Sequence, residues 1–521
     1  MIFPVSTLCV ATGIGVGLAS DLADSSLLSA VVFSRHGVRT PYSPEGGSLV
    51  WDSLQKYSRV WRDIPVSASS WGVESMADQH LTRHGAQVIS NMGEFYASSK
   101  RYGKFLGASG AAGPNCDDMF FYANNEVRTI QTARAFLEGM APSCTSQLKP
   151  AVAGAQSLFN QGDFQTPKCG PASRVEIEAL LGGSAGGFKA WNDAWRSTVA
   201  DIQALVQCCP DKSLCGSSAT GECTMLDVPT TWAGDYWEPL NGATHIAKVL
   251  ADFFLLSAMN NMTIALGQRP LSDVVEWHQL NDEVLDVANN AWSAKSYAST
   301  LAAHILASLQ QASTGVHVPG LLHGPHAKFV YMAGHDMNLL LLKTLLGLTW
   351  IVDGWPRDKP VLGGMLVFEL HRSGTHAHSV RMFFEAANPS QIRNASRFRV
   401  GVSTPSRAPV AIPGCPALDC PLATFHKIVS RALQVDCIHD ANLRRFILEG
   451  APRPSFDAGA SPAHSWERSR SKIFLVVLIT VLSAFASLAF LAAVMIGAHV
   501  RCRRCSPILF EAQSPLLATA S

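Results

Sequence analysis

The chain has 521 residues, which is enough for two or three domains and a large core. Its 41 Lys and Arg residues balance 40 Asp and Glu, and this net charge of +1 excludes a general nucleic-acid binder, which carries a basic excess. Charged residues make up 16% of the chain, against about 25% in soluble proteins, and the mean hydropathy is +0.14. Part of the apolar sequence is therefore expected to lie outside a globular core.

The N-terminal residues 1–19 are predicted to be a secretory signal peptide. Val5–Ala19 is an apolar run rich in Val, Leu, Ala and Gly, and its last three residues fit a small-x-small cleavage site. The run is too short to predict a membrane span. We therefore expect the chain from residue 20 onwards to enter a lumenal or extracellular compartment.

The first predicted strand, Ser29–Ser34, leads into Arg35-His36-Gly37-Val38-Arg39-Thr40-Pro41. The imidazole of His36 can attack phosphorus at mildly acid or neutral pH without a separate base. The planar guanidinium groups of Arg35 and Arg39 match phosphate oxygens, and Gly37 lets the backbone approach a ligand. This segment predicts a phosphoryl-transfer site with His36 as the nucleophile.

A second copy of the tripeptide, Arg83-His84-Gly85, acts as an internal control. Gln87 stands where the second arginine would be, and no proline follows. We therefore interpret this copy as surface residues that lead into a helix.

A second predicted strand, 119–123, is followed by a helix at 126–140 with apolar residues at helical spacing. Arg128 lies in the first turn of that helix, where it can join the arginines of the first segment. The alternative for Arg128 is an ordinary surface position on the helix.

A third predicted strand, 328–333, ends at Gly334-His335-Asp336. His335 can donate a hydrogen bond to a phosphoryl oxygen, and Asp336 can protonate the leaving oxygen. The alternative for Asp336 is an N-cap of the predicted helix 337–346.

Strands that alternate with helices, including a fourth strand at 364–370, predict a layered α/β domain with a mostly parallel sheet. Ligands bind at the carboxyl ends of such strands, so the three strand-end sites support one another. Between 151 and 320 the strand signal fades, and helix-like runs such as Val284–Gln311 predict an inserted, mostly helical domain. The predicted order is signal peptide 1–19, α/β domain 20–150 and 321–450, insert 151–320, stalk 451–472, transmembrane helix 473–498 and cytoplasmic tail 499–521.

The cysteines fit an oxidising compartment. Ten of the 13 lie between the signal peptide and the predicted span, and this even number predicts disulfides: Cys116, Cys144, Cys169, Cys208, Cys209, Cys215, Cys223, Cys415, Cys420 and Cys437. We expect the neighbours Cys208 and Cys209 to bond elsewhere, and zinc binding by the 208–223 cluster is the alternative. Two sequons predict N-glycosylation at Asn261 and Asn394.

The C-terminal segment Ile473–Ala498 contains no charge and is long enough to cross a bilayer with some tilt. With the signal peptide, it predicts a type I single-pass protein that contacts the lipid bilayer through this one helix. Cys502 and Cys505 in the tail are either palmitoylated or free thiols.

Three segments together resemble the signature blocks of the histidine acid phosphatase family: Arg35–Pro41, Arg128-Thr129 with Thr132-Ala133, and Gly334–Asp336. Their order and wide spacing match too, and Leu81-Thr82…Gly85 is similar to a further block of the family. The resemblance covers roughly residues 28–440. The signal, single span and short tail make the chain similar to the membrane-bound acid phosphatases of trypanosomatids.

This resemblance implies a phosphoglycerate-mutase-like α/β domain with a smaller helical insert. It also implies hydrolysis of phosphate monoesters at acid pH through a phosphohistidine, with no metal or other cofactor. Carried over, His36 is the nucleophile and Asp336 the proton donor, and the phosphoryl group is bound by Arg35, Arg39, Arg128 and His335. The insert matches no block of the family, so the substrate stays open.

Three other functions compete with this one. An inositol polyphosphate phosphatase would need a cluster of extra Lys and Arg, and a chain of net charge +1 shows no obvious one. An inactive receptor or adhesion ectodomain would tolerate loss of a site residue. A zinc enzyme using His371, His376 and His378 lacks the expected ligand spacing. Residence in endosomes or lysosomes, residence at the cell surface, and a homodimer all remain open.

Overall fold

The computed structural model describes residues 25–41, 49–61, 64, 67–99, 101–107, 114–151, 158–159, 168–211, 213, 223–233, 238–373 and 377–449. These residues fall in one compact unit that spans residues 1–452. The predicted signal peptide, stalk, transmembrane helix and tail lie outside the described residues. Among the helices that are described, none is long and apolar enough to cross a membrane.

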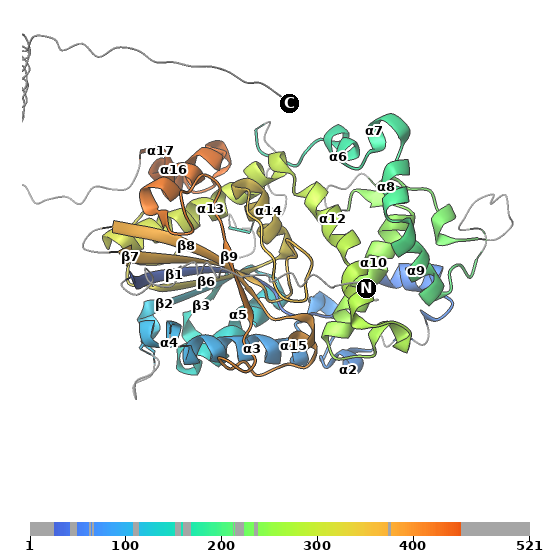
Figure 1. Ribbon diagram of the computed structural model, residues 1–521, viewed down its shortest axis with the longest axis horizontal. Helices are drawn as coiled ribbons and strands as arrows, with labels where there is room; N and C mark the ends of the chain where they lie inside the picture. Colours follow the sequence, from blue (N-terminus) through green and yellow to red (C-terminus); the bar gives the residue numbers. More distant parts are fainter. Residues whose placement is uncertain are drawn as a thin grey trace, which may run out of the picture. The chain divides into compact units, whose positions relative to one another are not determined.

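A mixed eight-stranded sheet forms the centre of the described residues, in the order β10-β8-β7-β1-β6-β2-β3 with β9 beside β8 (Figure 1). Strands β1, β6, β2 and β3 are parallel, and β7, β8, β9 and β10 join by antiparallel pairs. The bounds are β1 Ser25–Arg35, β2 Met119–Ala123, β3 Leu148–Pro150, β6 Phe329–Gly334, β7 Met365–Ser373, β8 Ala377–Ala386, β9 Ser406–Val410 and β10 Cys420–Pro421. The predicted α/β class is confirmed, and the four predicted strands correspond to β1, β2, β6 and β7.

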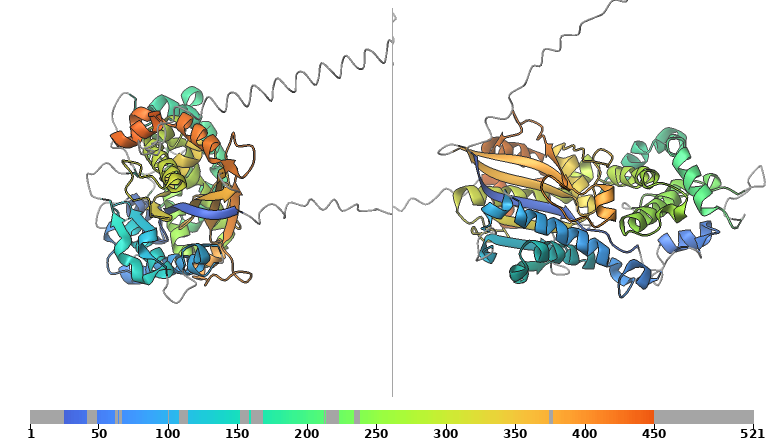
Figure 2. Two further views of the ribbon diagram at one scale, coloured as in Figure 1. Left: turned by 90° about the vertical axis from the view of Figure 1, so that its left-hand side faces the viewer. Right: turned by 60° about the horizontal axis from the view of Figure 1, so that its bottom comes forward.

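Helices cover both faces of the sheet (Figures 1 and 2). One face carries α13 Ala291–Thr314, α14 Asp336–Leu346, α16 Leu422–Ala432 and α17 Ala441–Glu449, and the other carries α3 Arg83–Ser98, α4 Tyr102–Phe105 and α5 Val127–Met140. Because β1 is covered on both sides, its residues 30–33 form a continuous apolar run that is fully buried.

The segment between β3 and β6 is mostly helical, with a short hairpin of β4 Thr231–Trp232 and β5 Leu240–Asn241. Its helices are α6 Arg174–Leu180, α7 Gly183–Gly186, α8 Lys189–Ala194, α9 Arg196–Val206, α10 Ala243–Met259, α11 Leu271–Trp277, α12 Gln279–Ala288 and α13. Outside this segment, the described residues also form the short helices α1 Leu49–Tyr57, α2 Ala68–Trp71 and α15 Pro389–Arg393.

The helix-like run predicted at 284–311 is interrupted. Helix α12 ends at Ala288, and the Asn290 side chain caps a new helix by accepting from the backbone N–H groups of Trp292 and Ser293. The new helix, α13, packs against β1, although it begins inside the predicted insert. The predicted domain boundaries stay predictions.

Disulfides join Cys116 to Cys144, Cys169 to Cys437, and Cys415 to Cys420. The prediction that Cys208 and Cys209 bond elsewhere is wrong. The structure pairs them with each other, across a cis peptide bond that brings their Cα atoms to 3.0 Å.

Candidate active site

The carboxyl ends of β1, β6 and β2 meet at one edge of the sheet. The three strands are parallel neighbours, and the register places Arg35 beside Gly334 and Ala123 beside Ala333. A side chain that directly follows any of the three strands therefore faces the same space. The structure brings all six predicted residues to this edge: Arg35, His36, Arg39, Arg128, His335 and Asp336.

His36 is buried, with 2% of its surface exposed, and its backbone bonds on both sides hold it in place. The N–H of His36 donates to the Gly334 carbonyl, and the His36 carbonyl accepts from Gly363, both at 2.9 Å. On the ring, Nδ1 lies 2.9 Å from the Gly37 carbonyl oxygen. A carbonyl can only accept, so Nδ1 carries the proton of the neutral ring and Nε2 keeps a lone pair.

The surroundings of His36 favour this neutral form. Burial, followed by the positive charges of Arg128, Arg35 and Arg39, holds the pKa of His36 well below its ordinary value. A nucleophile with a free lone pair is therefore present even in mildly acid solution.

Arg35 and Asp336 form an ion pair at the floor of the site. Arg35 Nη2 lies 2.7 Å from Asp336 Oδ2, and Arg35 Nη1 donates to the Pro360 carbonyl at 2.5 Å. The other carboxylate oxygen of Asp336 accepts from the N–H of Met337 in the first turn of α14. Burial raises the pKa of Asp336, but the neighbouring Arg35, followed by His335, outweighs this effect and holds the pKa below its ordinary value. The unliganded site thus contains Asp336 as a carboxylate.

His335 and Arg128 lie beside each other at the strand ends. Asn124 Nδ2 donates to His335 Nε2 at 2.8 Å, and the amide is fixed because its oxygen accepts from the N–H of Asn125. Arg128 Nη2, which can only donate, lies 3.3 Å from His335 Nδ1, so both ring nitrogens face donors. Burial, followed by the charge of Arg128, lowers the pKa of His335 well below its ordinary value. Arg128 also pairs with Glu126 through Nη1.

Arg39 lies further from the strand end, with Nη1 donating to the Thr40 carbonyl at 3.0 Å and Nη2 lying 3.4 Å from Asp252 Oδ2. Helix α5 supports the loop that follows β1 and carries His36 and Arg39. The Thr132 hydroxyl accepts from the N–H of Gly37 at 3.0 Å and donates to the Arg128 carbonyl at 2.7 Å.

The sequence motifs assigned no role to Asn124, Thr132 or Asp252. The spacing of Thr132 from Arg128, one helical turn, was the available signal for the threonine, because residues four apart share a helix face.

The second Arg-His-Gly copy opens α3, which confirms that it leads a helix, but only Arg83 is exposed and Gly85 is buried, so its interpretation as surface residues holds only in part. Thr82 is the N-cap and accepts from the N–H of Gly85, and His84 Nε2 lies 2.8 Å from the Ile392 carbonyl. This end of α3 packs against the first copy, because the N–H of Thr82 donates to the Val38 carbonyl at 2.9 Å.

The alternative residues lie elsewhere. His371 on β7 pairs with Glu369 at 2.9 Å, His378 is on β8, and His376 is outside the described residues. In the part of the chain that the structure describes, no group of three or more His, Cys, Asp or Glu is spaced to hold a metal ion. The two sequon residues, Asn261 and Asn394, are both exposed.

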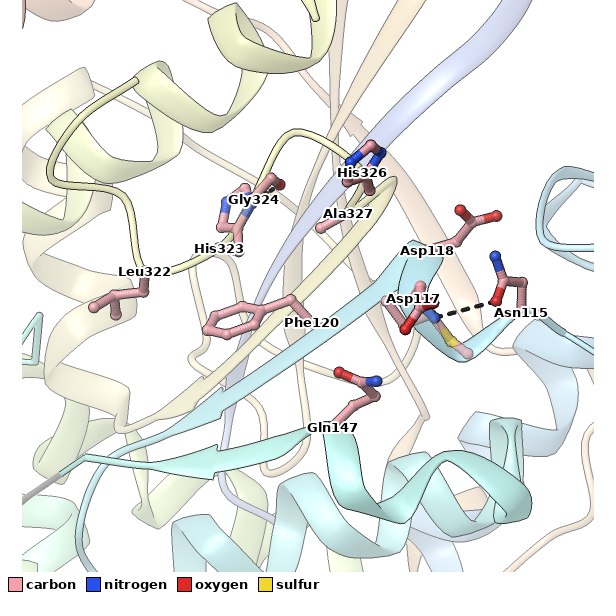
Figure 3. A pocket seen from close by; sticks show the side chains of 11 residues that line it. Asn115, Asp117, Asp118, Phe120, Gln147, Leu322, His323, Gly324, His326 and Ala327 are labelled. Carbon is pink, nitrogen blue, oxygen red and sulfur yellow. Dashed lines mark hydrogen bonds between the residues drawn. The ribbon is translucent and has the colours of Figure 1, made fainter. Parts of the chain in front are cut away.

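A cavity of about 560 Å³ lies at the opposite ends of β2 and β6 (Figure 3). Its lining includes Asp118, which pairs with Lys328 at 2.7 Å, and His323, which hydrogen-bonds the Ser308 hydroxyl at 2.9 Å. None of the predicted site residues lies there.

Known proteins are similar to this chain in both sequence and fold. The family model of the histidine phosphatase superfamily (branch 2) matches residues 26–167. The chain is 24% identical to the phytase AppA of Escherichia coli, over 80% of this chain and 94% of that one. It is 22% identical to the glucose-1-phosphatase of Providencia rettgeri, over 83% and 100%. A solved phytase of Hafnia alvei in complex with tartrate superimposes with a TM-score of 0.63 at 25% identity, over 80% and 99% of the two chains.

The strand-end site and these matches define a phosphate-ester hydrolase that acts through histidine. The resemblance to the histidine acid phosphatases is confirmed, within the histidine phosphatase superfamily (branch 2).

Proposed function

We propose that this protein is a membrane-anchored acid phosphatase that hydrolyses phosphate monoesters through a phosphohistidine on His36. The observation that carries the proposal is the hydrogen bond from His36 Nδ1 to the Gly37 carbonyl. It leaves Nε2 unprotonated inside a site that also holds Arg35, Arg39, Arg128 and His335, which we assign to phosphoryl binding.

The reaction takes two displacements. Nε2 of His36 attacks phosphorus, the bond to the leaving oxygen breaks, and Asp336 delivers a proton to that oxygen. Water then attacks the phosphohistidine, Asp336 takes its proton, and inorganic phosphate leaves with His36 restored. Arg35, Arg39 and Arg128 stabilise the charge that spreads over the phosphoryl oxygens.

The proton of the first step arrives with the substrate. Asp336 is a carboxylate in the unliganded site, since Arg35 keeps its pKa low. A phosphate monoester has a second pKa near 6, so below that pH it binds as a monoanion that carries one proton. Binding places that proton beside Asp336 and engages Arg35 with phosphate oxygens. This supply of protons is the physical reason for activity in acid.

The membrane part of the proposal is supported by the sequence alone. The segments 1–19 and 473–498 indicate a type I protein with its catalytic domain lumenal or extracellular, in endosomes, lysosomes or at the cell surface. The membrane-bound acid phosphatases of trypanosomatids are the narrower group that this arrangement favours. Chain truncated before Ile473 should be secreted as active enzyme, and recovery of only aggregated or inactive secreted protein would contradict this.

A second candidate is a phosphatase for phytate or glucose 1-phosphate. It is favoured by the names of the relatives, which are phytases and glucose-1-phosphatases. Values of kcat/KM for phytate, glucose 1-phosphate and glycerol phosphate would rank the three. A preference for phytate of a hundredfold or more, that is about 2.7 kcal/mol, would favour the second candidate.

The proposal is tested by hydrolysis of an aryl phosphate across pH. Activity should rise as the pH falls below about 6, where the substrate becomes a monoanion. Folded protein that releases no phosphate at any pH, from aryl or alkyl esters, would overturn the proposal.

A further inference from the structure

A chain of buried polar residues leads away from Arg39, and the reaction described above does not use it. Asp252 on α10 accepts from Arg39 through Oδ2 at 3.4 Å and lies 3.2 Å from His278 Nε2 through Oδ1. Nδ1 of His278 lies 2.6 Å from the ammonium of Lys359. Lys359 also pairs with Asp282 Oδ2.

The contacts of His278 set which ring nitrogen accepts and which donates. Nδ1 faces the ammonium of Lys359 at 2.6 Å, which can only donate, and Oδ1 of Asp282 at the longer distance of 3.4 Å. With Nδ1 accepting from the nearer Lys359, Nε2 donates to Asp252 at 3.2 Å and orients the carboxylate toward Arg39. Without Lys359, Nδ1 faces only the Asp282 carboxylate and can donate to it instead.

Three segments that are distant in the sequence meet here, and the residues that they contribute are buried or largely buried. His278 is fully buried between α11 and α12, Lys359 is 1% exposed on the loop between α14 and β7, and Asp252 and Asp282 are largely buried. Burial lowers the pKa of Lys359, while Asp282 opposes this effect. Burial raises the pKa of Asp252, but Arg39 and His278 outweigh it and hold the pKa below its ordinary value.

The same loop also contacts the first arginine of the site. Pro360 follows Lys359, and its carbonyl accepts from Arg35 Nη1. The loop therefore supports Arg35 directly, through the Pro360 carbonyl. It supports Arg39 indirectly, because Lys359 contacts His278 and His278 contacts Asp252. Both arginines must point at the same phosphoryl group.

We propose that Lys359 and His278 are positioning residues for the phosphate site. Lys359 sets the tautomer of His278, His278 orients Asp252, and Asp252 holds Arg39 in the geometry that binds phosphoryl oxygens. The inference rests on the proposed function, since it assigns Arg39 to the phosphoryl group.

The test compares His278→Leu, His278→Gln and Lys359→Met in the full-length protein. The measurements are the dissociation constant for inorganic phosphate by calorimetry, kcat/KM for an aryl and an alkyl phosphate, and the melting temperature. His278→Leu and Lys359→Met should weaken phosphate binding and lower kcat/KM by about 10- to 100-fold. Losses of this size follow when residues that hold the ligands of metal sites in place are removed. Gln can accept from Lys359 and donate to Asp252 at once, so it should stay within about threefold of wild type.

The losses should be equal for the two leaving groups, because Arg39 contacts the phosphoryl group that both substrates share. The double variant Lys359→Met with Asp282→Leu distinguishes a positioning role of Lys359 from a purely structural one, because it removes both charges of the buried pair. We expect this variant to regain the melting temperature while its phosphate affinity stays low. Recovery of both together would overturn the inference.

Wild-type phosphate affinity in folded Lys359→Met would also overturn the inference, as would equal losses for His278→Gln and His278→Leu. Protein that binds phosphate but hydrolyses no ester overturns the proposed function instead, and the affinities still decide the inference. Wild type that neither binds phosphate nor hydrolyses esters overturns both.

Discussion

The same tripeptide, Arg-His-Gly, occurs twice in this chain and has two different chemistries. At His36 the carbonyl of Gly37 occupies Nδ1, so Nε2 holds the lone pair and faces a site with three arginines. At His84 the carbonyl of Ile392 occupies Nε2, so that nitrogen is the donor. The comparison teaches that the acceptor beside each ring, set by the fold, decides which nitrogen can react.

The two glycines differ as well. A Cβ on Gly37 would meet the flexible side chains of Ile89 and Leu81, at 2.8 and 3.0 Å. A Cβ on Gly85 would collide with the backbone oxygen of Val38. The second copy is therefore a packing element for the first, because its glycine lets α3 approach the loop that carries His36.

The largest expected effect comes from deleting each histidine in turn. His36→Ala removes the nucleophile and should lower kcat on the order of 10⁴-fold or more. His84→Ala removes one hydrogen bond on a helix end, and kcat should stay within about twofold while the unfolding free energy falls by about 1 kcal/mol. Steady-state kinetics and thermal unfolding check the pair. Equal kinetic losses in the two variants would contradict the distinction.

The next effect concerns Asp336, which has a proton-transfer role only if the first copy is the reactive one. Asp336→Asn keeps the shape but cannot deliver a proton, and a poor leaving group such as glycerol needs that proton. The loss should be about 10²- to 10⁴-fold for alkyl phosphates and clearly smaller for aryl phosphates.

The outcome for both leaving groups separates three roles for Asp336. The alternative of an N-cap at Asp336 is wrong, because His335 is the N-cap of α14 and Asp336 is its first residue. A purely structural role would be limited to the bond that Asp336 accepts from Met337, which Asn can also accept, and it predicts near wild-type kcat/KM for both. An equal, large loss for both would indicate that Asp336 orients Arg35 instead.

The glycines should separate stability from activity. Gly85→Ala forces α3 away from Val38 and should cost about 1–3 kcal/mol of unfolding free energy. Gly37→Ala displaces only side chains, so its loss of unfolding free energy should be smaller. Its loss of activity should be larger than that of Gly85→Ala, because Gly37 directly follows the nucleophile His36. Chemical denaturation and kcat/KM measure both. A larger stability loss at Gly37 than at Gly85 would refute this reading.

The pH dependence of stability should report the surroundings of His36. Burial and the arginines lower the pKa of His36 in the folded state, while an unfolded histidine titrates near 6.5. Below that pH the unfolded chain binds a proton that folded His36 does not. The contribution of His36 is thus present above about pH 6.5 and is lost on acidification, by at most about 1.4 kcal/mol per pH unit.

His36→Ala should flatten the fall of the unfolding free energy between about pH 6.5 and 4.5. Denaturant titrations at several pH values check this. A wild-type slope in His36→Ala would show that His36 binds protons equally in the folded and unfolded states, which contradicts its lowered pKa.

The smallest expected effect is that of a chelator. The positive charge around His36 comes from Arg35, Arg39 and Arg128, so activity should be unchanged in excess chelator. Vanadate should inhibit, because it adopts the five-coordinate geometry of phosphorus in transfer. Loss of activity that zinc or magnesium restores would contradict the expectation.

The sequence was sufficient for residues that directly follow strands. β1, β2 and β6 are short apolar runs buried on both faces, so the positions of His36 and Asp336 at one edge follow from the parallel order. The antiparallel strands β8, β9 and β10 and the edge strand β3 were not predicted. The break before Ala291, where Asn290 caps the start of a new helix, was not predicted either.

The support behind the arginines could not be predicted. Asp252, His278 and Lys359 come from a helix, a helix junction and a loop, and each is an ordinary polar residue in its own segment. Their association depends on how α10 and α12 pack against the loop before β7, and no spacing in the sequence records that packing.

The central claim is that His36, and not His84, carries the phosphoryl group. The direct measurement is to quench wild-type protein during turnover of a phosphate-labelled ester, denature it, and map the label. We expect acid-labile phosphate on His36 in wild type and in His84→Ala, and none in His36→Ala. Continued hydrolysis by wild type with no label trapped on His36, or with label on His84, would contradict the claim.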